Sequence, residues 1–403
     1  METDKMDGYP LAVSSWSADE VAAIQQVIRR DRFTMGDEVA AFEREFAEGH
    51  GSRYCVMVNS GSSANLLAVA SLFFRKDIPL QRGDEVIVPA ISWATTFAPL
   101  QQYGLRVKLI DVDLETLNMD LDALEQAIGP RTRLVFCVNL LGNPNDFARI
   151  QDIIAGRDVL LIEDNCESMG AEYEGRKTGT FGLLGTFSTF FSHHMSTMEG
   201  GLILTDDEEL YHLLLSLRAH GWTRSLPEEN SLVTKETDPF LEEFRFILPG
   251  YNVRPLEMSG AVGRVQWRKL PGFVEARRSN AAYFRERFEG HPHLMIQREI
   301  GSSSFFGFSL VIRPDSPWSR TDLIECMRAR DIECRPIVAG NFAASESIKW
   351  YDHEVCGELS NAEHVSSHGF FVGNHHLDIR KQIDLLAGAM AVVKEKSAGV
   401  RGS

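Results

Sequence analysis

A chain of 403 residues, of which 44% are hydrophobic, is long enough to bury one large core and a smaller second domain. Its net charge of -16 argues against nucleic acid or an anionic membrane as a general partner, because both need a basic face. The sequence therefore predicts a soluble globular protein that binds any phosphate-bearing ligand at a local site.

The N-terminus, METDKMDGYP, is acidic and has no apolar leader, and the apolar stretch at residues 66–74 is far too short for a membrane span. We therefore expect a cytoplasmic protein. The cysteines have neither a CxxC pair nor a regular spacing, so we expect buried or incidental thiols. They are Cys55, Cys137, Cys166, Cys326, Cys334 and Cys356.

Apolar runs alternate with helical patterns from about residue 54 to residue 220. Runs that are continuously apolar are typical of a mostly parallel sheet covered on both faces, and ligands bind at the carboxyl ends of such strands. The strands are expected at 54–58, 85–90, 106–113, 133–140 and 158–164, with helices at 62–75 and 145–156 among those between them.

A long charged helical pattern follows from residue 254 to about residue 289, with a break expected at Pro271. Beyond it, strand patterns alternate with helical ones and predict a small C-terminal α+β domain. The predicted strands are 305–313 and 333–338, and the predicted helices are 322–331 and 378–396. We place the boundary so that residues 1–265 form the large domain and residues 266–403 the small one.

The motif SGSSAN, residues 60–65, follows a predicted strand and opens a predicted helix. Gly61, Ser62 and Ser63 would present backbone N–H groups and hydroxyls at the positive end of that helix, as a phosphate cradle does. Serine is also a common helix cap, so the motif alone leaves both interpretations open.

Two further motifs lie at predicted strand ends. LIEDNCES, residues 161–168, places Asp164 and Glu167 where a carboxylate could pair with a protonated ring nitrogen, although a loop-capping acid has the same pattern. ISWATT, residues 91–96, places Trp93 where an indole could stack on a cofactor ring or pack beneath a loop.

The segment TFSTFFSHHMSTMEGG, residues 186–201, contains two adjacent histidines. An imidazole titrates near neutral pH and can transfer protons, so His193 and its neighbour His194 are candidates for acid–base chemistry. The alternative is a pair of histidines with only structural roles. Ser188 in the same segment could add a hydroxyl to the phosphate site.

In this order, and together with RAHGW (218–222) and GYNVRP (250–255), the motifs resemble the DegT/DnrJ/EryC1 family of sugar-nucleotide aminotransferases. These are pyridoxal-phosphate (PLP) enzymes of fold type I, and the resemblance runs from near Tyr9 almost to the C-terminus. It implies an α/β fold with a large three-layer, PLP-binding domain and a small C-terminal domain. Ordinary members carry the Schiff-base lysine where this chain has His193.

The histidine implies a changed reaction. SHH before MEGG and RAHGWTR after it are similar to the lysine-less 3-dehydratase branch of the family, which acts on GDP-4-keto-6-deoxy-D-mannose in the colitose route to O-antigen lipopolysaccharide. The resemblance implies PLP and pyridoxamine phosphate bound non-covalently, His193 as the group that moves a proton, removal of the sugar's hydroxyl at carbon 3, and L-glutamate as the amino donor.

The resemblance also implies roles for other residues. Asp164 would pair with the ring nitrogen, Trp93 would stack on the ring, and Glu167 would lie beside the ring hydroxyl. The phosphate would be held by Gly61, Ser62, Ser63, Ser188 and, from the other subunit of a homodimer, Asn252. The nucleotide-sugar pocket would be lined by His220, Arg224, Glu333 and Arg335.

Several alternatives remain open on the sequence. The substrate could be a CDP- or dTDP-4-keto-6-deoxyhexose, or another lysine such as Lys177 could serve an ordinary aminotransferase. The branch of lysine-less dehydratases with an iron–sulfur cluster needs a close set of cysteines, which the spread from Cys55 to Cys356 does not offer, and we expect no metal. A non-enzyme would explain the missing lysine but not the retained acid, hydroxyls and imidazole.

Overall fold

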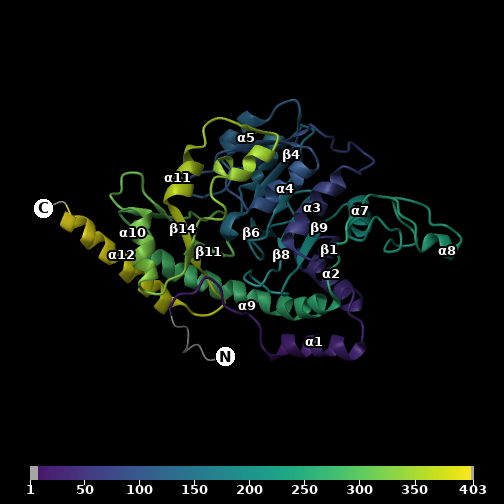
Figure 1. The fold of residues 1–403 in the computed structure, drawn as a ribbon, viewed down its shortest axis with the longest axis horizontal. Coiled ribbons are helices and arrows are strands. Elements are labelled where there is room, and N and C mark those ends of the chain that lie inside the picture. Colours follow the sequence, from purple (N-terminus) through teal and green to yellow (C-terminus); the bar gives the residue numbers. More distant parts are fainter. Residues whose placement is uncertain (1–7, 401–403) are drawn as a thin grey trace.

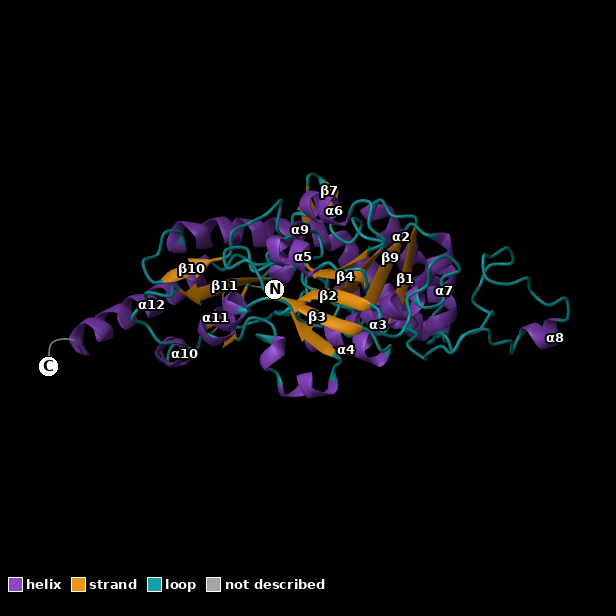
Figure 2. Cartoon of the chain, turned by 90° about the horizontal axis from the view of Figure 1, so that it is seen from above, coloured by secondary structure: helices purple, strands orange, loops and turns teal. Residues whose placement is uncertain are grey.

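The computed structural model describes residues 8–400. Its centre is an eight-stranded sheet in which β9 alone runs against its neighbours β1 and β8, while the remaining pairs are parallel (Figures 1 and 2). The mostly parallel sheet predicted from the apolar runs is thus confirmed. The order is β1 (Tyr54–Val58), β9 (Gly201–Thr205), β8 (Leu184–Ser188), β5 (Leu160–Asp164), β4 (Thr132–Val138), β2 (Glu85–Pro89), β3 (Arg106–Ile110) and β13 (His353–Val355).

Helices cover both faces of this sheet, because successive strand residues point to opposite sides and most of them are apolar. One face packs on α3 (Gly61–Leu72), α4 (Ala94–Gln102) and α7 (Glu208–Arg218). The other face packs on α2 (Asp37–His50), α5 (Leu121–Ala127), α6 (Phe147–Ile154) and part of α9 (Glu257–Phe288). This gives the three layers expected for the large domain.

The smaller sheet is antiparallel, in the order β10 (Leu294–Ile296), β11 (Gly307–Ile312), β14 (Gly369–Gly373) and β12 (Cys334–Arg335). One face packs against α9, α10 (Arg320–Arg328) and α12 (Arg380–Val400), and the other packs against α11 (Ser360–His368). The α+β character predicted for the C-terminal region is confirmed. The boundary after residue 265 stays a prediction, because α9 runs through it and contacts both sheets' cores.

The break expected at Pro271 is wrong, since α9 continues through this proline over 32 residues. Leu270 and Val274 on either side of it are buried against the large domain. Packing along the length of the helix therefore outweighs the single hydrogen bond that proline removes.

The remaining elements are short or lie at the periphery. Helix α1 (Ala18–Arg30) packs beside α9 (Figure 1). Between α7 and α9, residues 222–256 form a projecting arm that contains α8 (Pro239–Glu242) (Figure 2). The others are the hairpin β6 (Glu172–Tyr173) and β7 (Arg176–Lys177) and the 3-10 turns η2 (Leu140–Gly142), η3 (Phe342–Ala344) and η4 (Glu346–Trp350).

Within the described part of the chain, no helix has both the length and the apolar character that crossing a bilayer requires.

Candidate active site

Asp164 ends β5 at the carboxyl edge of the parallel strands, with β4 and β8 on either side. Its Oδ2 accepts hydrogen bonds from Asn65 Nδ2 at 2.8 Å and Thr96 Oγ1 at 2.9 Å, and its Oδ1 accepts one from the Cys166 backbone N–H at 3.1 Å. Three donors from three different segments fix the orientation of this buried carboxylate. It is therefore placed to receive one positively charged partner in a defined direction.

The first turn of α3 lies next to Ser188 of β8. A Cβ atom on Gly61 would lie 2.6 Å from Ser188 Cβ and 2.9 Å from Cys166 Sγ, so only glycine fits there. Ser60 caps the helix, its Oγ accepting from the Ser63 N–H at 3.1 Å. The cap and the candidate cradle thus coexist, and the helix N-terminus with the Ser188 hydroxyl forms one polar corner.

The side chains of the two other serines of this motif are held differently. Ser63 Oγ donates to Asn59 Oδ1 at 2.6 Å, whereas Ser62 Oγ donates to Thr95 Oγ1 at 2.9 Å at an exposed position. Ser62 therefore faces the start of α4, where Trp93 is the residue before the helix and is 58% exposed. The two motifs that were far apart in sequence meet here.

His193 lies in the segment after β8, residues 189–200, which has no helix or strand and is called the His193 turn below. Its Nδ1 lies 2.7 Å from the Cys166 carbonyl oxygen. A carbonyl only accepts, so Nδ1 carries the proton and Nε2 keeps its lone pair. Burial lowers the pKa of His193 to about 4, against the opposing effect of the Cys166 hydrogen bond and of Asp164. The ring is thus neutral at pH 7 and able to accept a proton.

His194 is held in the opposite way. Its Nε2 lies 3.1 Å from the Ser304 carbonyl oxygen and so donates to it, while its Nδ1 is buried and has no partner among the described residues. Burial holds the pKa of His194 well below its usual range. Because His193 reaches the segment between Asp164 and Glu167 and His194 reaches Ser304, the structure separates the two candidates.

The two acids near Asp164 in sequence, Glu163 and Glu167, have different hydrogen-bond partners. Glu167 Oε2 accepts from the Leu141 N–H at 3.0 Å, and burial raises the pKa of its carboxyl to about 7. The side chain of Glu163 instead accepts from the backbone N–H groups of three residues in the loop before β8, at 2.6 to 2.8 Å. These are Gly179, Phe181 and Gly182. Glu163 therefore braces that loop rather than the site.

Asp164, Glu167, Ser188, His193 and the start of α3 are referred to below as the floor. The other candidate residues lie in two further groups. His220 and Asn252 lie at the base of the arm, close to the floor, because Asn59 N donates to Val253 O at 3.0 Å. The His220 ring contacts Trp222 at a centroid distance of 4.8 Å, and the Arg224 side chain is exposed.

Glu333 and Arg335 form the third group, in the small domain. Both line a pocket beside Leu11, whose backbone N–H donates to Glu333 Oε2 at 2.8 Å. No hydrogen bond between described residues links this pair directly to the floor.

Reasoning from sequence missed the groups that orient the site. Asn65 and Thr96 stand within the two quoted motifs, and the signal that could have found them is a polar residue at a position where a helix faces the sheet. Cys166, taken for an incidental thiol, supplies the carbonyl that fixes the tautomer of His193.

Lys177, the alternative lysine, lies on β7, where Nζ donates to the Gly49 carbonyl at 2.6 Å and sits over the Trp267 ring. The six cysteines are free thiols, and residues 8–400 contain no group of three His, Cys, Asp or Glu side chains arranged to hold a metal ion.

Comparisons with known proteins place the chain in a family. The model of the DegT/DnrJ/EryC1/StrS aminotransferase family matches residues 15–385. GDP-4-keto-6-deoxy-D-mannose 3-dehydratase of Yersinia pseudotuberculosis is 56% identical over 94% of this chain and 97% of that protein. The protein of the same name from Escherichia coli O55:H7 is 54% identical over 94% of this chain and 99% of that protein.

A crystal structure of GDP-4-keto-6-deoxymannose-3-dehydratase with a trapped PLP-glutamate geminal diamine is also similar to this chain. It has a TM-score of 0.94 and 54% identity, and the match covers 95% of this chain and 100% of that one. The fold-type I architecture expected from the motifs is thereby confirmed.

Proposed function

The chain belongs to the DegT/DnrJ/EryC1/StrS aminotransferase family, and on that basis we propose that it is a PLP-dependent GDP-4-keto-6-deoxy-D-mannose 3-dehydratase. The observation that carries the proposal is the state of His193. Its Nδ1–H is bound to the Cys166 carbonyl, so a neutral Nε2 with a free lone pair stands where ordinary family members have a lysine.

The floor suits a pyridoxal cofactor on two independent grounds. Asp164 is oriented by three donors and can pair with a protonated ring nitrogen. The corner between Gly61 and Ser188, which a Cβ would fill, can take the phosphate at the N-terminus of α3. Trp93 and Glu167 are the residues we assign to the ring face and the ring hydroxyl. When bound in its pyridoxamine form, the cofactor supplies an amine and an electron-accepting ring, which is the chemistry that expels a hydroxyl next to a keto-derived carbon.

The residues of this chain then divide the work. His193 Nε2 accepts a proton from the carbon next to the cofactor amine and can return it, because the Cys166 carbonyl holds the ring in one tautomer. Imidazole cannot form the imine through which lysine tethers the cofactor, so the cofactor is held by non-covalent contacts, among them those of Asp164, Ser188 and the α3 N-terminus.

The substrate and the amino donor are assigned through the relatives. Their names specify a GDP-linked 4-keto sugar, and the trapped adduct in the solved relative contains glutamate. We assign His220 and Arg224 at the base of the arm, and Glu333 and Arg335 in the small domain, to the nucleotide-sugar pocket. A guanidinium suits the diphosphate because its planar fork donates two parallel hydrogen bonds.

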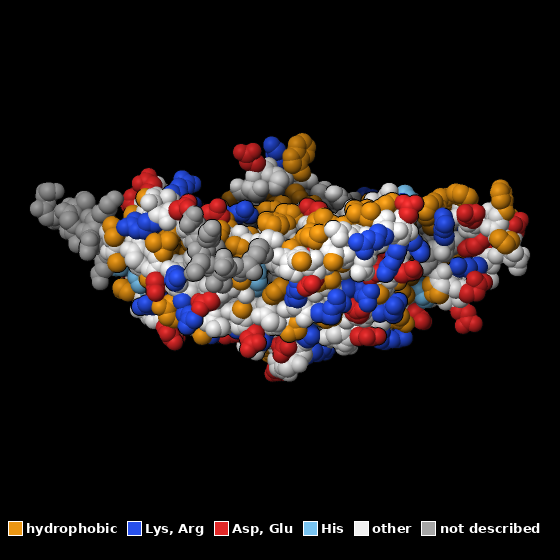
Figure 3. All heavy atoms as spheres, turned by 90° about the horizontal axis from the view of Figure 1, so that it is seen from below, with side chains coloured by type: hydrophobic (Ala, Val, Ile, Leu, Met, Phe, Trp, Pro, Cys, Tyr) orange, Lys and Arg blue, Asp and Glu red, His pale blue; other side chains and the backbone are white. Residues whose placement is uncertain are grey.

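We further propose a homodimer in which Asn252 reaches the phosphate site of the other subunit. Large apolar side chains remain exposed beside the floor and on the arm, and Figure 3 shows hydrophobic side chains gathered along one edge of the molecule. The exposed large apolar side chains include Trp93, Phe190, Phe191 and Met198 beside the floor, and Phe240, Leu241, Phe244 and Phe246 on the arm. An apolar surface of this extent is typical of a protein–protein contact.

The decisive experiment supplies the purified protein with pyridoxamine phosphate and a 4-keto-6-deoxy sugar linked to GDP, CDP or dTDP in parallel. We expect ammonia and a 3-deoxy product from the GDP sugar. A 4-amino sugar as the product would show that the chain is an aminotransferase. Turnover of only the CDP or dTDP sugar would show that the nucleotide of the substrate is not GDP.

A His193→Lys variant tests the role of the imidazole. We expect it to lose dehydration and to gain a lysine adduct after borohydride reduction of the PLP form, whereas the unaltered protein should give no adduct. A variant that dehydrates as fast as the parent would refute the role assigned to His193.

A further inference from the structure

The backbone of the His193 turn is tied to other parts of the chain at Ser196, in addition to the side-chain contacts of His193 and His194. Some backbone groups of the turn bond to each other, as the Thr197 N–H does to the Thr189 carbonyl at 2.9 Å. Ser196 differs, because its N–H donates to Gln266 Oε1 at 3.0 Å and its carbonyl accepts from Trp16 Nε1 at 3.0 Å. Both backbone groups of a residue three positions after His193 are therefore bound to other parts of the chain.

Gln266 on α9 is completely buried, and its amide can take only one orientation. Nε2 donates to Glu20 Oε1 at 2.7 Å and to the Ser15 carbonyl at 3.2 Å, whereas Oε1 accepts from Ser196 N and from Ser15 Oγ at 2.7 Å. Reversing the amide would place its N–H2 against the Ser196 N–H and its oxygen against a carboxylate. The network thus fixes the acceptor that holds Ser196.

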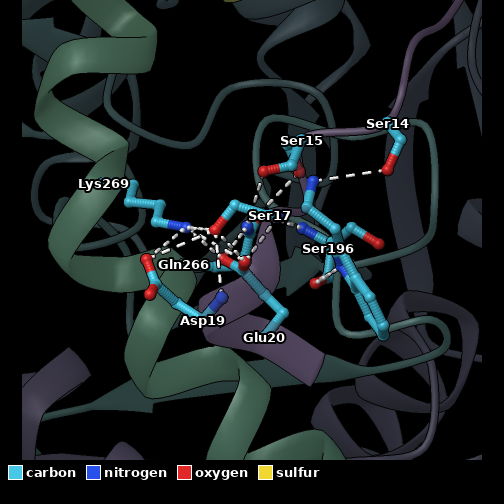
Figure 4. A network of polar contacts seen from close by, with 9 residues as sticks. Ser14, Ser15, Ser17, Asp19, Glu20, Ser196, Gln266 and Lys269 are labelled. Atoms are coloured by element: carbon cyan, nitrogen blue, oxygen red, sulfur yellow. Dashed lines mark hydrogen bonds and ion pairs between the residues drawn. The ribbon is translucent and has the colours of Figure 1, made fainter. Parts of the chain in front are cut away.

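Glu20 anchors this network from α1. The side chain is fully buried, and it accepts from Lys269 Nζ at 2.8 Å and from the Ser17 N–H at 2.7 Å, in addition to Gln266 (Figure 4). Burial raises the pKa of the Glu20 carboxyl, but the hydrogen bonds from these three donors outweigh it and bring the pKa to about 2. The carboxylate therefore stays ionised at every pH at which the protein would be assayed.

Residues 9–16, the strap, connect this network to the small domain. At its far end, Tyr9 N donates to the Asp331 carbonyl at 2.8 Å and the Tyr9 carbonyl accepts from Glu333 N at 2.9 Å. Leu11 N donates to the Glu333 side chain at 2.8 Å. One continuous segment thus contacts a residue that we assign to the substrate pocket and, five residues later, the turn that carries His193.

We infer that the strap positions the catalytic base, with Trp16 and Gln266 as the positioning residues that hold Ser196 and thereby the His193 turn. This inference rests on the proposed function for its kinetic consequence only. Neither residue touches His193. Both restrict the backbone motion of the His193 turn, which has no regular secondary structure. This restriction keeps Nε2 of His193 in the position that proton transfer requires.

The test uses the full-length chain and two single substitutions, Trp16→Phe and Gln266→Met. Each removes one hydrogen bond to Ser196 and leaves an apolar side chain in its place, and Gln266→Met also removes the hydrogen bonds to Ser15 and Glu20. The matched control is Arg264→Met, because Arg264 lies on the same helix and donates to Glu38 at 2.7 Å and Glu45 at 2.8 Å, on α2 rather than on the strap. Hydrogen–deuterium exchange of the peptide spanning residues 192–198 is measured without ligand, and kcat and KM for the GDP sugar are measured with it.

We expect both test variants to speed exchange in this peptide by about tenfold, the factor that a lost hydrogen bond of ordinary strength allows. We also expect kcat to fall by about tenfold with KM changed less than twofold, while Arg264→Met leaves both values at those of the parent. Exchange and kcat unchanged in both test variants would overturn the inference, as would an equal fall in kcat in Arg264→Met. Because exchange is read without substrate, it decides the role of the strap even if the proposed reaction is wrong.

Discussion

The floor and the arm complete their contacts to different degrees. On the floor, the polar groups that define the site are met within this one chain: Asp164 has three donors, His193 has a carbonyl at Nδ1, and Glu167 has a backbone N–H. On the arm, polar ends are capped, as Asp238 caps α8, but Phe240 is 78% exposed and three other large apolar side chains share its surface.

This difference between the floor and the arm separates contacts that one chain can make by itself from contacts that require a second chain. Hydrogen bonds act over a few ångströms, so neighbouring groups of a single chain can supply all the donors and acceptors that orient a polar site. Apolar burial needs area, and the exposed side chains around Phe240 find none within their own chain, although Leu226 and Ile247 of the arm pack on the core of the large domain. We therefore expect chemistry to fail when the floor is changed, and assembly to fail when the arm is changed.

The largest effect expected is on the floor. His193→Asn keeps a side chain that can hydrogen-bond but has no group that accepts a proton near neutral pH, so kcat should fall by about 10²- to 10⁴-fold. His194→Gln is the matched control, because Gln can still donate to the Ser304 carbonyl as His194 does. Ammonia release measures both. Equal losses in the two variants would show that the floor does not distinguish the neighbours.

The next effect is expected on the arm. Phe240→Ser combined with Phe244→Ser removes two apolar side chains, each of which stabilises a contact by roughly 1.5–3 kcal/mol when buried. We expect the dissociation constant of the dimer to rise by roughly 100-fold or more, as measured by sedimentation at micromolar concentration. A parent protein that is already monomeric, or a double variant that remains as dimeric as the parent, would contradict the comparison.

Sequence alone predicted the parts that depend on short-range pattern. The strands from β1 to β5 are continuous apolar runs, and their motifs fall at strand ends, so the sheet and the acid at the end of β5 could both be found. The helix through Pro271 could not, because its stability comes from packing against α2 and the sheet rather than from local preference. Strand β13 is three residues long and pairs with β3 about 250 positions earlier, a contact that leaves no local signal.

The same distinction holds in the site. Asp164 and His193 could be proposed as site residues because they lie in recognisable sequence motifs. Asn65, Thr96 and Cys166 could not, because they act through contacts that form only when distant segments meet. The resemblance assigned the catalytic role to His193 rather than His194, an assignment that stays a prediction, and gave no structural reason for separating the two. The reason is which carbonyl each imidazole reaches, and that depends on where Cys166 and Ser304 lie in space.

A smaller effect is expected at Glu163, the buried acid that precedes Asp164 and lies outside the floor. Burial raises the pKa of this carboxyl from its ordinary value of 4.5 to about 7, against hydrogen bonds from Gly179, Gly182 and Phe181. Between these values the folded protein holds a proton that the unfolded chain has released. This contribution to stability is therefore full below pH 4.5 and is lost as the pH rises through 7.

Glu163→Gln cannot titrate, so its urea midpoint should depend less on pH between 5 and 8 than that of the parent. At pH 5 we expect it to be less stable by about 1–3 kcal/mol, because an amide N–H2 then faces backbone N–H donors. Its kcat should equal that of the parent, in contrast to His193→Asn. A pH dependence identical to the parent's would mean that Glu163 titrates no differently in the folded and unfolded chain.

The smallest effect is expected at Lys177, which bears on whether the floor needs a lysine at all. Its Nζ donates to the Gly49 carbonyl at an exposed position and lies over Trp267, so Lys177→Met removes one surface contact and should change the free energy of unfolding by less than about 0.5 kcal/mol. Because the Lys177 ammonium donates to Gly49 and no hydrogen bond between described residues joins it to the floor, kcat and the amount of cofactor retained after gel filtration should match the parent. Loss of retained cofactor in this variant would mean that Lys177 reaches the floor in solution. The floor would then hold its cofactor through a covalent bond to lysine as well as through hydrogen bonds.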